Sequence, residues 1–465
     1  MPLGDQYGVV NVRSYGARGD GVADDTAAIQ SALSEGGRVW VPAGTYRVTA
    51  PLRVGSDTSV QGVGYKSVIQ CVGVQGDGLL MKATAGALQR AGLRELRISG
   101  SVTGAAISTE LAYSVVLDQL WVDATAEDSF RFKLTAGSSL TNLNAADSVA
   151  TRANFAMLDN FAANHCANWY TAVVPVPYNF YIDTDGGCNT FDAMTAQGGT
   201  VGLYVRRLGT SVFNGFYTEG TVHPLIVGDW ATLACPFALT FNSPTLRGPM
   251  PTHPNYAERS VAVEVSYARG VQFNAPAFES LGTGQSAPIT FSGGGGTGAW
   301  GISRVTPAGA ISSIEVIFGG SGYTEAPTVE IGGAGAGATA VATLAGDAVG
   351  SIAVTAPGTG YAGRYLIPLR YVYSGGVTIS EPFCNTGGVG WSMWPGIVRA
   401  ADSSEYSGGI HVVGDKAPLA EAIHTDRNGT AELLKAVGVR DRHYLVWRDV
   451  DGVEQRRPYT PPVYP

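Results

Sequence analysis

The sequence is poor in charge and has no long apolar run. Asp, Glu, Lys and Arg make up only 15% of its 465 residues, and the net charge is −8 with a pI near 5.3. An acidic chain disfavours nucleic acid as a partner, because contacts to phosphates need lysine and arginine. No stretch approaches the ~18 consecutive apolar residues that span a bilayer, so we expect no insertion into a membrane.

Cysteine and histidine are also scarce, and neither is spaced for a metal site. His165, His223 and His253 lack the spacing of metal ligands. The cysteines are odd in number and contain no CxxC pair, which predicts buried free thiols at Cys71, Cys166, Cys188, Cys235 and Cys384. We therefore expect neither a metal cluster nor a cofactor.

Glycine, by contrast, is abundant, with 63 residues, and together with the low charge it predicts many short strands joined by tight turns.

The segment Val9–Ala50 begins with a β-branched strand, Val9–Val12, followed by the turn GARGDG. A helix of about three turns is predicted to start at Asp24-Asp25-Thr26, whose oxygens suit free N–H groups, and to end at Gly36-Gly37. A second strand, Arg38–Pro42, and a Pro-Gly turn complete the unit.

Four groups of residues occur in order within this segment: Tyr15-Gly16-Ala17, Gly19-Asp20-Gly21, Asp24-Asp25-Thr26-Ala27-Ala28-Ile29 and Val41-Pro42-Ala43-Gly44-Thr45-Tyr46. Together they resemble the opening of the pectate-lyase-3-like right-handed parallel β-helices, which in phages are tailspikes and capsule depolymerases. The resemblance implies an all-β chain, a right-handed parallel β-helix solenoid with a short N-terminal capping helix. It also implies a closed homotrimer.

Repeated residues predict the turns of this solenoid. Leu96, Leu120 and Leu143 recur at separations of 24 and 23 residues. A second series begins with an aromatic residue followed by Asp or Asn, at Phe191, Phe213, Phe241 and Phe273, with a weaker copy at Ile379. Periods in this range indicate stacked units that bury a core only together. Since neighbours on a strand face opposite ways, we expect the phenylalanines inside and the Asp or Asn outside.

The residues Gln285–Gly363 interrupt this register. The stretch has 79 residues and 19 glycines, and it repeats itself with a period of 38–39 residues, so that Gly322-Tyr323 matches Gly360-Tyr361. Alternating apolar residues in Ile314–Phe318 and Ser351–Val354 predict two small β units rather than a flexible linker, which is the alternative.

These boundaries divide the chain as follows: a virion-attachment segment 1–8, a cap motif 9–50, a parallel β-helix 51–284, a Gly-rich double β repeat 285–363, final β-helix turns 364–404 and a capping or trimerisation module 405–465. In the last module Thr430–Val437 favours a short helix and Tyr444–Arg448 a strand. Pro175 and Pro177 predict a loop between Trp169 and Tyr181 that leaves the solenoid wall.

The candidate catalytic residues come from one count along the aromatic register. Six residues after each core aromatic stand Gln197, Glu219, Arg247, Glu279 and Asn385. If these form a column with a step of ~4.8 Å, Glu219 and Glu279 lie about 10 Å apart at Cα, close to the ~6.5–9.5 Å carboxyl separation of inverting glycosidases. Arg247 would lie between them and favour ionisation of one carboxylate. The alternative is an exposed ladder of ion pairs.

A second acidic group, Asp183, Asp185 and Asp192, is the next candidate for catalysis, although a plain turn or a calcium ligand set are alternatives. For binding sugar we predict Tyr217, Trp169 and Tyr170, whose rings could stack on a ligand or equally lie in the core.

The resemblance implies a phage tailspike or tail-fibre protein that recognises and degrades host surface polysaccharide, with hydrolysis favoured over elimination. A non-enzymatic adhesin and a polysaccharide lyase are the alternatives. The expected partners are the host glycan and a phage tail or baseplate adaptor protein. The expected location is the virion, after assembly in the bacterial cytoplasm and release on lysis.

Overall fold

The computed structural model describes residues 8–172, 176–221, 223–229, 231–247, 259–279, 289–305, 309–332 and 335–361, and strands between residues 365 and 459. Most of the predicted attachment segment 1–8 therefore lies outside the described residues, as does His253. The chain is all-β and forms a β-solenoid of about nine turns, so the predicted fold class is confirmed. Within the part that is described, no helix is long and apolar enough to cross a membrane.

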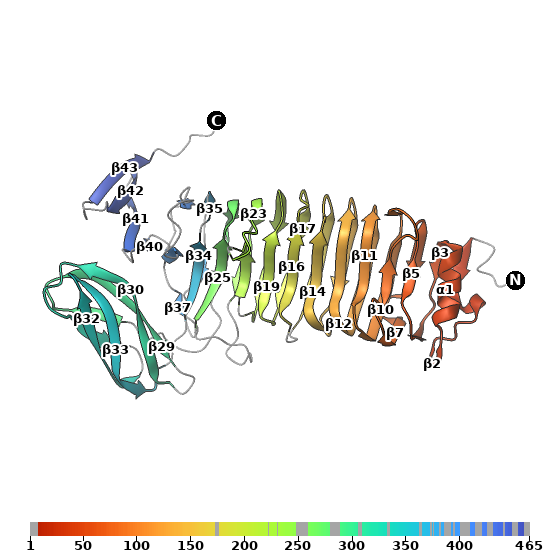
Figure 1. Ribbon diagram of the computed structural model, residues 1–465, viewed down its shortest axis with the longest axis horizontal. Helices are drawn as coiled ribbons and strands as arrows, with labels where there is room; N and C mark the ends of the chain where they lie inside the picture. The colour runs from red at the N-terminus through yellow and green to blue at the C-terminus, as the bar shows by residue number, and fades with distance from the viewer. Residues whose placement is uncertain are drawn as a thin grey trace. The chain divides into compact units, whose positions relative to one another are not determined.

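The chain divides into two compact units. The first comprises Met1–Thr245 with Tyr267–Asn274, and the second Leu246–Ser266 with Ala275–Pro465. In the first unit the strands of successive turns pair in parallel along the solenoid (Figure 1), and their pairings fall into three series that we call sheets 1, 2 and 3.

Sheet 1 contains the strands that lead into each turn. It is made of β1 (Val9–Asn11), β3 (Gly37–Trp40), β6 (Thr58–Gln61), the first parts of β10 (Gly92–Val102), β12 (Val116–Ala136), β13 (Ser139–Asn144) and β15 (His165–Thr171), then β17 (Thr190–Asp192), β20 (Ser211–Asn214), β23 (Phe237–Asn242) and β26 (Arg269–Asn274).

Sheet 2 continues from sheet 1. It is made of β4 (Gly44–Val48), which also pairs with β2 (Asp20–Asp24), of β7 (Ser67–Val74), of later parts of β10, β12, β13 and β15, and of β18 (Thr195–Gln197) and β21 (Tyr217–Glu219).

Sheet 3 closes each turn. It is made of β5 (Leu52–Val54), β8 (Leu79–Met81), β9 (Leu88–Gln89), β11 (Ala105–Tyr113), the end of β12, β14 (Val149–Asp159), β16 (Tyr178–Thr184), β19 (Val201–Arg207) and β22 (His223–Val227).

The core of the first unit contains the predicted aromatic column. Phe191, Phe213, Phe241 and Phe273 are buried in register on neighbouring turns, and their ring centroids lie 4.5, 4.6 and 5.1 Å apart with nearly parallel planes. The residues that follow them form an amide ladder, in which Asn214, Asn242 and Asn274 each donate to the side chain of the preceding turn over 2.6–2.8 Å. The sequence register is therefore confirmed in this part of the chain.

The opening segment has helix α1 (Thr26–Glu35) and two short 3₁₀ turns, η2 (Val12–Tyr15) and η3 (Gly64–Lys66). Asp25 does not cap the helix with its side chain. Instead, its buried carboxylate accepts hydrogen bonds from the N–H groups of Arg18 and Gly19, and so holds the glycine-rich turn. Gly19 has a φ of +64°, and a Cβ there would lie 2.8 Å from the ring of Tyr46, so only glycine fits.

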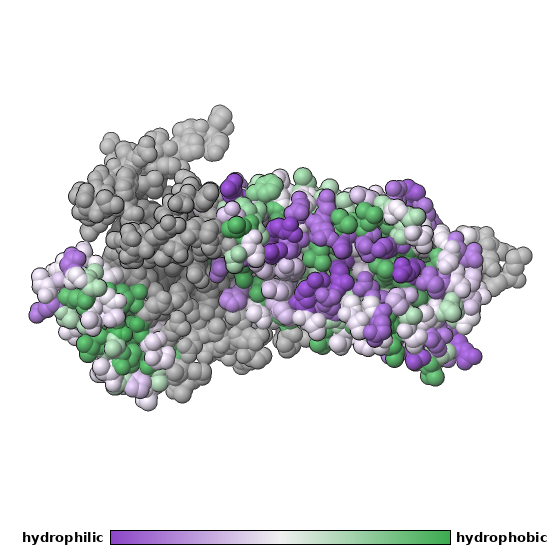
Figure 2. Space-filling model, in the orientation of Figure 1, coloured by the Kyte–Doolittle hydropathy of each residue, from purple (hydrophilic) through white to green (hydrophobic). Residues whose placement is uncertain are grey.

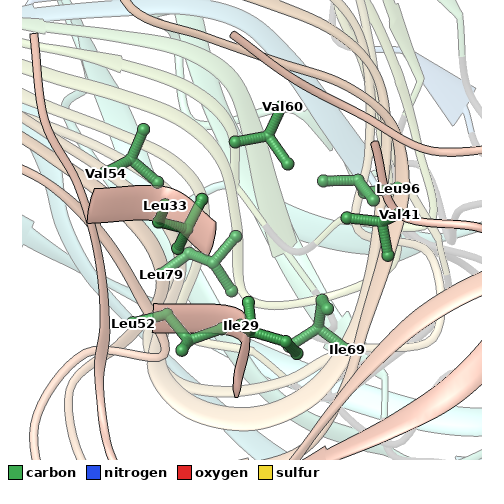
Figure 3. A pocket seen from close by; sticks show the side chains of 9 residues that line it. All are labelled: Ile29, Leu33, Val41, Leu52, Val54, Val60, Ile69, Leu79 and Leu96. Carbon is green, nitrogen blue, oxygen red and sulfur yellow. The ribbon is translucent and has the colours of Figure 1, made fainter. Parts of the chain in front are cut away.

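Side chains of α1 and of the first turns surround a small apolar cavity (Figure 3). Ile29 and Leu33 of the helix are buried there. The cavity is lined by Ile29, Leu33, Val41, Leu52, Val54, Val60, Ile69, Leu79 and Leu96. That α1 caps the solenoid stays a prediction.

The second unit contains further parallel strands. β25 (Arg259–Ser266) pairs with β34 (Tyr365–Val372), and β27 (Ala277–Glu279) pairs with β36 (Phe383–Asn385). Outside the glycine-rich stretch, the further strands between residues 245 and 425 are β24 (Thr245–Arg247), β35 (Val377–Ser380), β37 (Ser392–Met393), β38 (Gly396–Arg399), β39 (Ile410–Val413) and β40 (Glu421–Thr425). The chain thus returns to parallel pairing after the glycine-rich stretch.

The glycine-rich stretch forms antiparallel sheets of its own. β28 (Ile289–Ser292) pairs with β31 (Thr328–Ile331), and two hairpins are formed by β29 (Thr297–Val305) with β30 (Ile311–Ser321) and by β32 (Ala336–Ala345) with β33 (Ala348–Thr359). The repeated tyrosines, Tyr323 and Tyr361, are both buried, and each packs on a glycine where a Cβ would lie 2.4 or 2.3 Å from the ring. The matching positions of the sequence repeat therefore have matching packing roles.

Three local predictions were wrong. Thr430–Val437 is not a helix, because Ala431–Val439 is strand β41, paired antiparallel with β40 and with β42 (Arg442–Arg448), which pairs in turn with β43 (Glu454–Tyr459). Strand pairing outweighs a modest helix propensity here. Trp169 and Tyr181 lie within strands β15 and β16, so a loop over the whole of 169–181 is wrong, and residues 173–175 lie outside the described residues. Finally, Cys188 is exposed, whereas Cys71 and Cys166 are buried free thiols.

Candidate functional site

Two members of the predicted polar column lie next to each other on the outer face of sheet 2. Gln197 and Glu219 are register partners on neighbouring turns, as the count from the aromatic residues predicts. The hydroxyl of Tyr217 donates to Glu219 Oε2 over 2.9 Å, and the amide of Gln197 donates to the same oxygen over 3.4 Å. The hydroxyl of Tyr170 donates to Gln197 Oε1 over 2.9 Å. Two aromatic rings, an amide and a carboxylate therefore form one connected, half-buried group.

The other two predicted catalytic residues lie in the second unit and contact each other. Arg247 Nε donates to Glu279 Oε2 over 2.5 Å, with side-chain exposures of 31% and 20%. Glu279 is in register with Asn385, again as the count predicts. This ion pair is a contact that the ladder alternative also requires, so the catalytic roles of Glu219, Arg247 and Glu279 stay predictions.

Trp169 was wrongly predicted to bind sugar. Its indole is fully buried, its Nε1 donates to the carbonyl of Leu140 over 2.7 Å, and its ring stacks on Phe155 with centroids 4.8 Å apart. A signal for this was present in the sequence. Trp169 follows Leu143 by one turn and is its register partner, so it continues the inward series Leu96, Leu120 and Leu143.

The second acidic group is divided between two sheets. Asp192, on sheet 1, accepts from the amide of Asn214 over 2.6 Å and lies 3.6 Å from Nδ1 of His165. Asp183 belongs to sheet 3, and Asp185 follows it in the chain, and both accept hydrogen bonds from Arg207, at 2.5 and 2.8 Å. The three carboxylates therefore do not form one site.

Sheet 3 carries a tyrosine cluster that the sequence reasoning missed. Tyr178, Tyr181 and Tyr204 are half-buried, and their ring centroids lie 5.2–5.7 Å apart. Tyr181 and Tyr204 are register partners, each directly after a buried residue of its strand, and this alternation was a signal for the cluster. Figure 2 shows hydrophilic residues gathered where β12, β14 and β16 are drawn in Figure 1.

The charges beside the tyrosine cluster are held in place by arginines. Burial raises the pKa of Asp183, but the hydrogen bonds from Arg207 and Arg206 outweigh it, so this pKa lies below its ordinary value. Burial raises the pKa of Tyr204, and the charge of Asp229 raises it further. Asp183 is therefore a stable anion, which suits it to fixing the arginines rather than to donating a proton.

A fully buried carboxylate lies further along the same sheet. Asp128 accepts from Arg131 Nε over 2.7 Å and from Arg152 Nε over 2.8 Å, and Arg131 also donates to Glu127 and Asp77. Among the described residues there is no group of three or more His, Cys, Asp or Glu side chains placed to hold a metal ion.

Comparisons with known proteins support the resemblance suggested by the opening motif. Residues 9–113 match the family described as rhamnogalacturonase A/epimerase, pectate lyase-like. The pre-neck appendage protein of Bacillus phage phi29 is 41% identical over 64 residues, which is 14% of this chain and 7% of that protein. Mannuronan C5-epimerase AlgE5 of Azotobacter vinelandii is 57% identical over 44 residues, 8% of this chain and 4% of that protein. The predicted resemblance to pectate-lyase-like proteins and phage appendages is confirmed for this part of the chain.

Two solved structures have a similar course of the chain. The A-module of mannuronan C-5 epimerase AlgE6 from Azotobacter vinelandii is 15% identical, with 84% of this chain and 99% of that chain covered and a TM-score of 0.42. Tailspike protein 3 of bacteriophage CBA120 is 11% identical, with 97% and 70% covered and a TM-score of 0.41. The chain spans less than a tenth of the length of the curated relatives that it matches.

Proposed function

We propose that this protein is a phage tailspike or tail appendage that recognises host surface polysaccharide and degrades it by glycoside hydrolysis. The observation that carries the proposal is the group around Glu219, a carboxylate on the outer face of a β-solenoid, held by Tyr217 and Gln197 beside Tyr170. The similarity of the opening residues to phage pre-neck appendage proteins supports the assignment to a phage tail.

The chemistry suits proton transfer to a sugar. The Tyr217 hydroxyl and the Gln197 amide, two neutral donors, bind one oxygen of Glu219 and orient the carboxyl. A positioned carboxyl of this kind typically contributes about 10²–10⁴-fold to glycoside cleavage as a general acid or base. The second carboxylate in our proposal is Glu279, which Arg247 orients.

The ion pair of Arg247 with Glu279 favours a second candidate, an adhesin that grips the glycan without cutting it. In that case the carboxylates stabilise the solenoid wall and bind sugar hydroxyls. As partners we propose the host glycan, a phage tail adaptor and two further copies of the chain. Light scattering of the purified protein tests the trimer, and a monomeric mass would contradict it.

The deciding experiment is to incubate the protein with capsules and exopolysaccharides of candidate hosts. New reducing ends and the ultraviolet absorbance of an unsaturated sugar are followed together. We expect reducing ends without the absorbance, whereas both signals together would indicate a lyase and neither would favour the adhesin.

Three variants then test the site. Glu219→Gln and Glu279→Gln should each lower the cleavage rate at least ~100-fold, because glutamine keeps the shape but cannot transfer the proton. Glu110→Gln is the matched control, since Glu110 lies on sheet 3 and pairs with Lys82. Full activity of Glu219→Gln would reject Glu219 as a catalytic residue.

A further inference from the structure

A line of outward residues runs along sheet 2 through five turns. Strand register places Trp121 beside Asn144, Asn144 beside Tyr170, Tyr170 beside Thr195, and Thr195 beside Tyr217. Aromatic residues thus occupy every second turn, and shorter polar residues occupy the turns between them. Turns of a solenoid lie ~4.8 Å apart, so the aromatic residues recur at about 10 Å.

We propose that this line is a binding track for an extended β-linked polysaccharide, with a sugar at each turn and every second sugar stacked on an aromatic ring. In such a glycan each sugar is turned over relative to the one before it. The same apolar face therefore recurs every second sugar, which matches rings at every second turn. The proposal rests on the proposed function, because Tyr217 at one end of the track holds Glu219.

The far end of the track offers polar atoms that lack partners. Nε1 of Trp121 and Oδ1 of Asp123 are buried and have no hydrogen-bond partner among the described residues. Buried polar atoms are nearly always hydrogen-bonded, so each exception calls for an explanation. Both residues face outward from β12 two positions apart, about 7 Å along the strand. A donor and an acceptor that face outward from the same strand suit two hydroxyl groups of one sugar.

The surroundings of Trp121 mark where the track ends. Tyr65 of η3 is 49% exposed and stands edge-on against Trp121, with ring centroids 5.3 Å apart and planes at 84°. The guanidinium of Arg97, which is paired with Asp123, lies 4.2 Å from the centre of the Tyr65 ring. Arg97, on the turn before Trp121, and Tyr65, on the turn before that, therefore close the track, which leaves room for about five sugars at one per turn.

The test uses titration calorimetry with cello-, chito- and mannuronan oligosaccharides of about two to eight sugars. Cleavage is suppressed by the Glu219→Gln change in every sample. For the oligosaccharide series that binds, we expect the affinity to rise with chain length up to about five sugars and then to level off. Trp121→Ala should lower affinity about tenfold, and only for ligands long enough to reach that turn. Tyr170→Ala should lower the affinity for shorter ligands as well.

Controls separate binding from folding. Tyr113→Ala removes an exposed tyrosine of sheet 3 and should leave affinity unchanged. Trp121→Phe keeps the ring but loses the indole N–H, so it should recover part of the lost affinity at an unchanged melting temperature. Three results would each overturn the track: an equal loss of affinity at all ligand lengths, no loss of affinity in Trp121→Ala, or no binding of any of the three oligosaccharide series.

The two proposals fail in different ways. If length-dependent binding is found but Glu219→Gln still cleaves polysaccharide, the catalytic assignment is rejected and the track stands. If Glu219→Gln abolishes cleavage but Trp121→Ala binds every length as the parent does, the track is rejected and the catalytic assignment stands.

Discussion

Replacing Asp128 by asparagine should destabilise the solenoid far more than the same change at Asp57. The two carboxylates resemble each other in that both accept from the guanidinium Nε of an arginine on a neighbouring turn, Arg152 and Arg90. They differ in burial, because the Asp128 side chain is 0% exposed, whereas that of Asp57 is 61% exposed.

The size of the effect follows from the hydrogen bonds. Oδ1 of Asp128 accepts from Arg152, and Oδ2 accepts from Arg131. An asparagine amide has only one oxygen, so in either orientation its NH₂ group meets a guanidinium N–H. Breaking a buried ion pair in this way costs about 3–5 kcal/mol. For a unit of this size each kcal/mol lowers the melting temperature by roughly 2–4 °C, so we expect a fall of about 10 °C.

The measurement is thermal unfolding followed by circular dichroism, with both variants prepared side by side. Asp57→Asn should have nearly the same melting temperature as the parent protein, because water replaces a partner lost at the surface. If Asp128→Asn also melts within about 2 °C of the parent, the buried pair is not a determinant of stability and the reasoning is refuted.

Three further outcomes are expected. Phe213→Ala should cost about 3–5 kcal/mol in unfolding experiments, because it leaves a cavity in the middle of the phenylalanine column, and Phe213→Leu should cost less; equal losses would contradict this. Asp183 has a pKa held below its ordinary value of 3.8 by Arg206 and Arg207, so its stabilising effect is present above that pH and is lost below it. The melting temperature of the parent should therefore fall more steeply below about pH 4 than that of Asp183→Asn, and parallel curves would reject the role. Deleting 285–363 with a short linker should leave a soluble, folded solenoid, and aggregation of the deletion variant would show that the stretch is needed for folding.

The sequence alone determined the elements that repeat once per turn. The phenylalanine column, the amide ladder and the neighbours Gln197 and Glu219 were all found by counting residues. This succeeds because each turn of a solenoid buries one residue at the same place, so contacts in space become a period in the chain. The match of Tyr323 with Tyr361 was found in the same way.

Only the tertiary structure decided which outward side chains meet. Turns differ in length, so a count along the chain does not fix which outward side chains touch, such as Tyr181 and Tyr204. The tyrosine cluster of sheet 3 and the pairing of Asp128 with Arg152 depend on where each strand begins after its corner. Strand β41 shows the same limit, because its pairing with two neighbours outweighs a local preference for helix. Side chains at a surface are placed by register between strands, and register is a property of the folded chain.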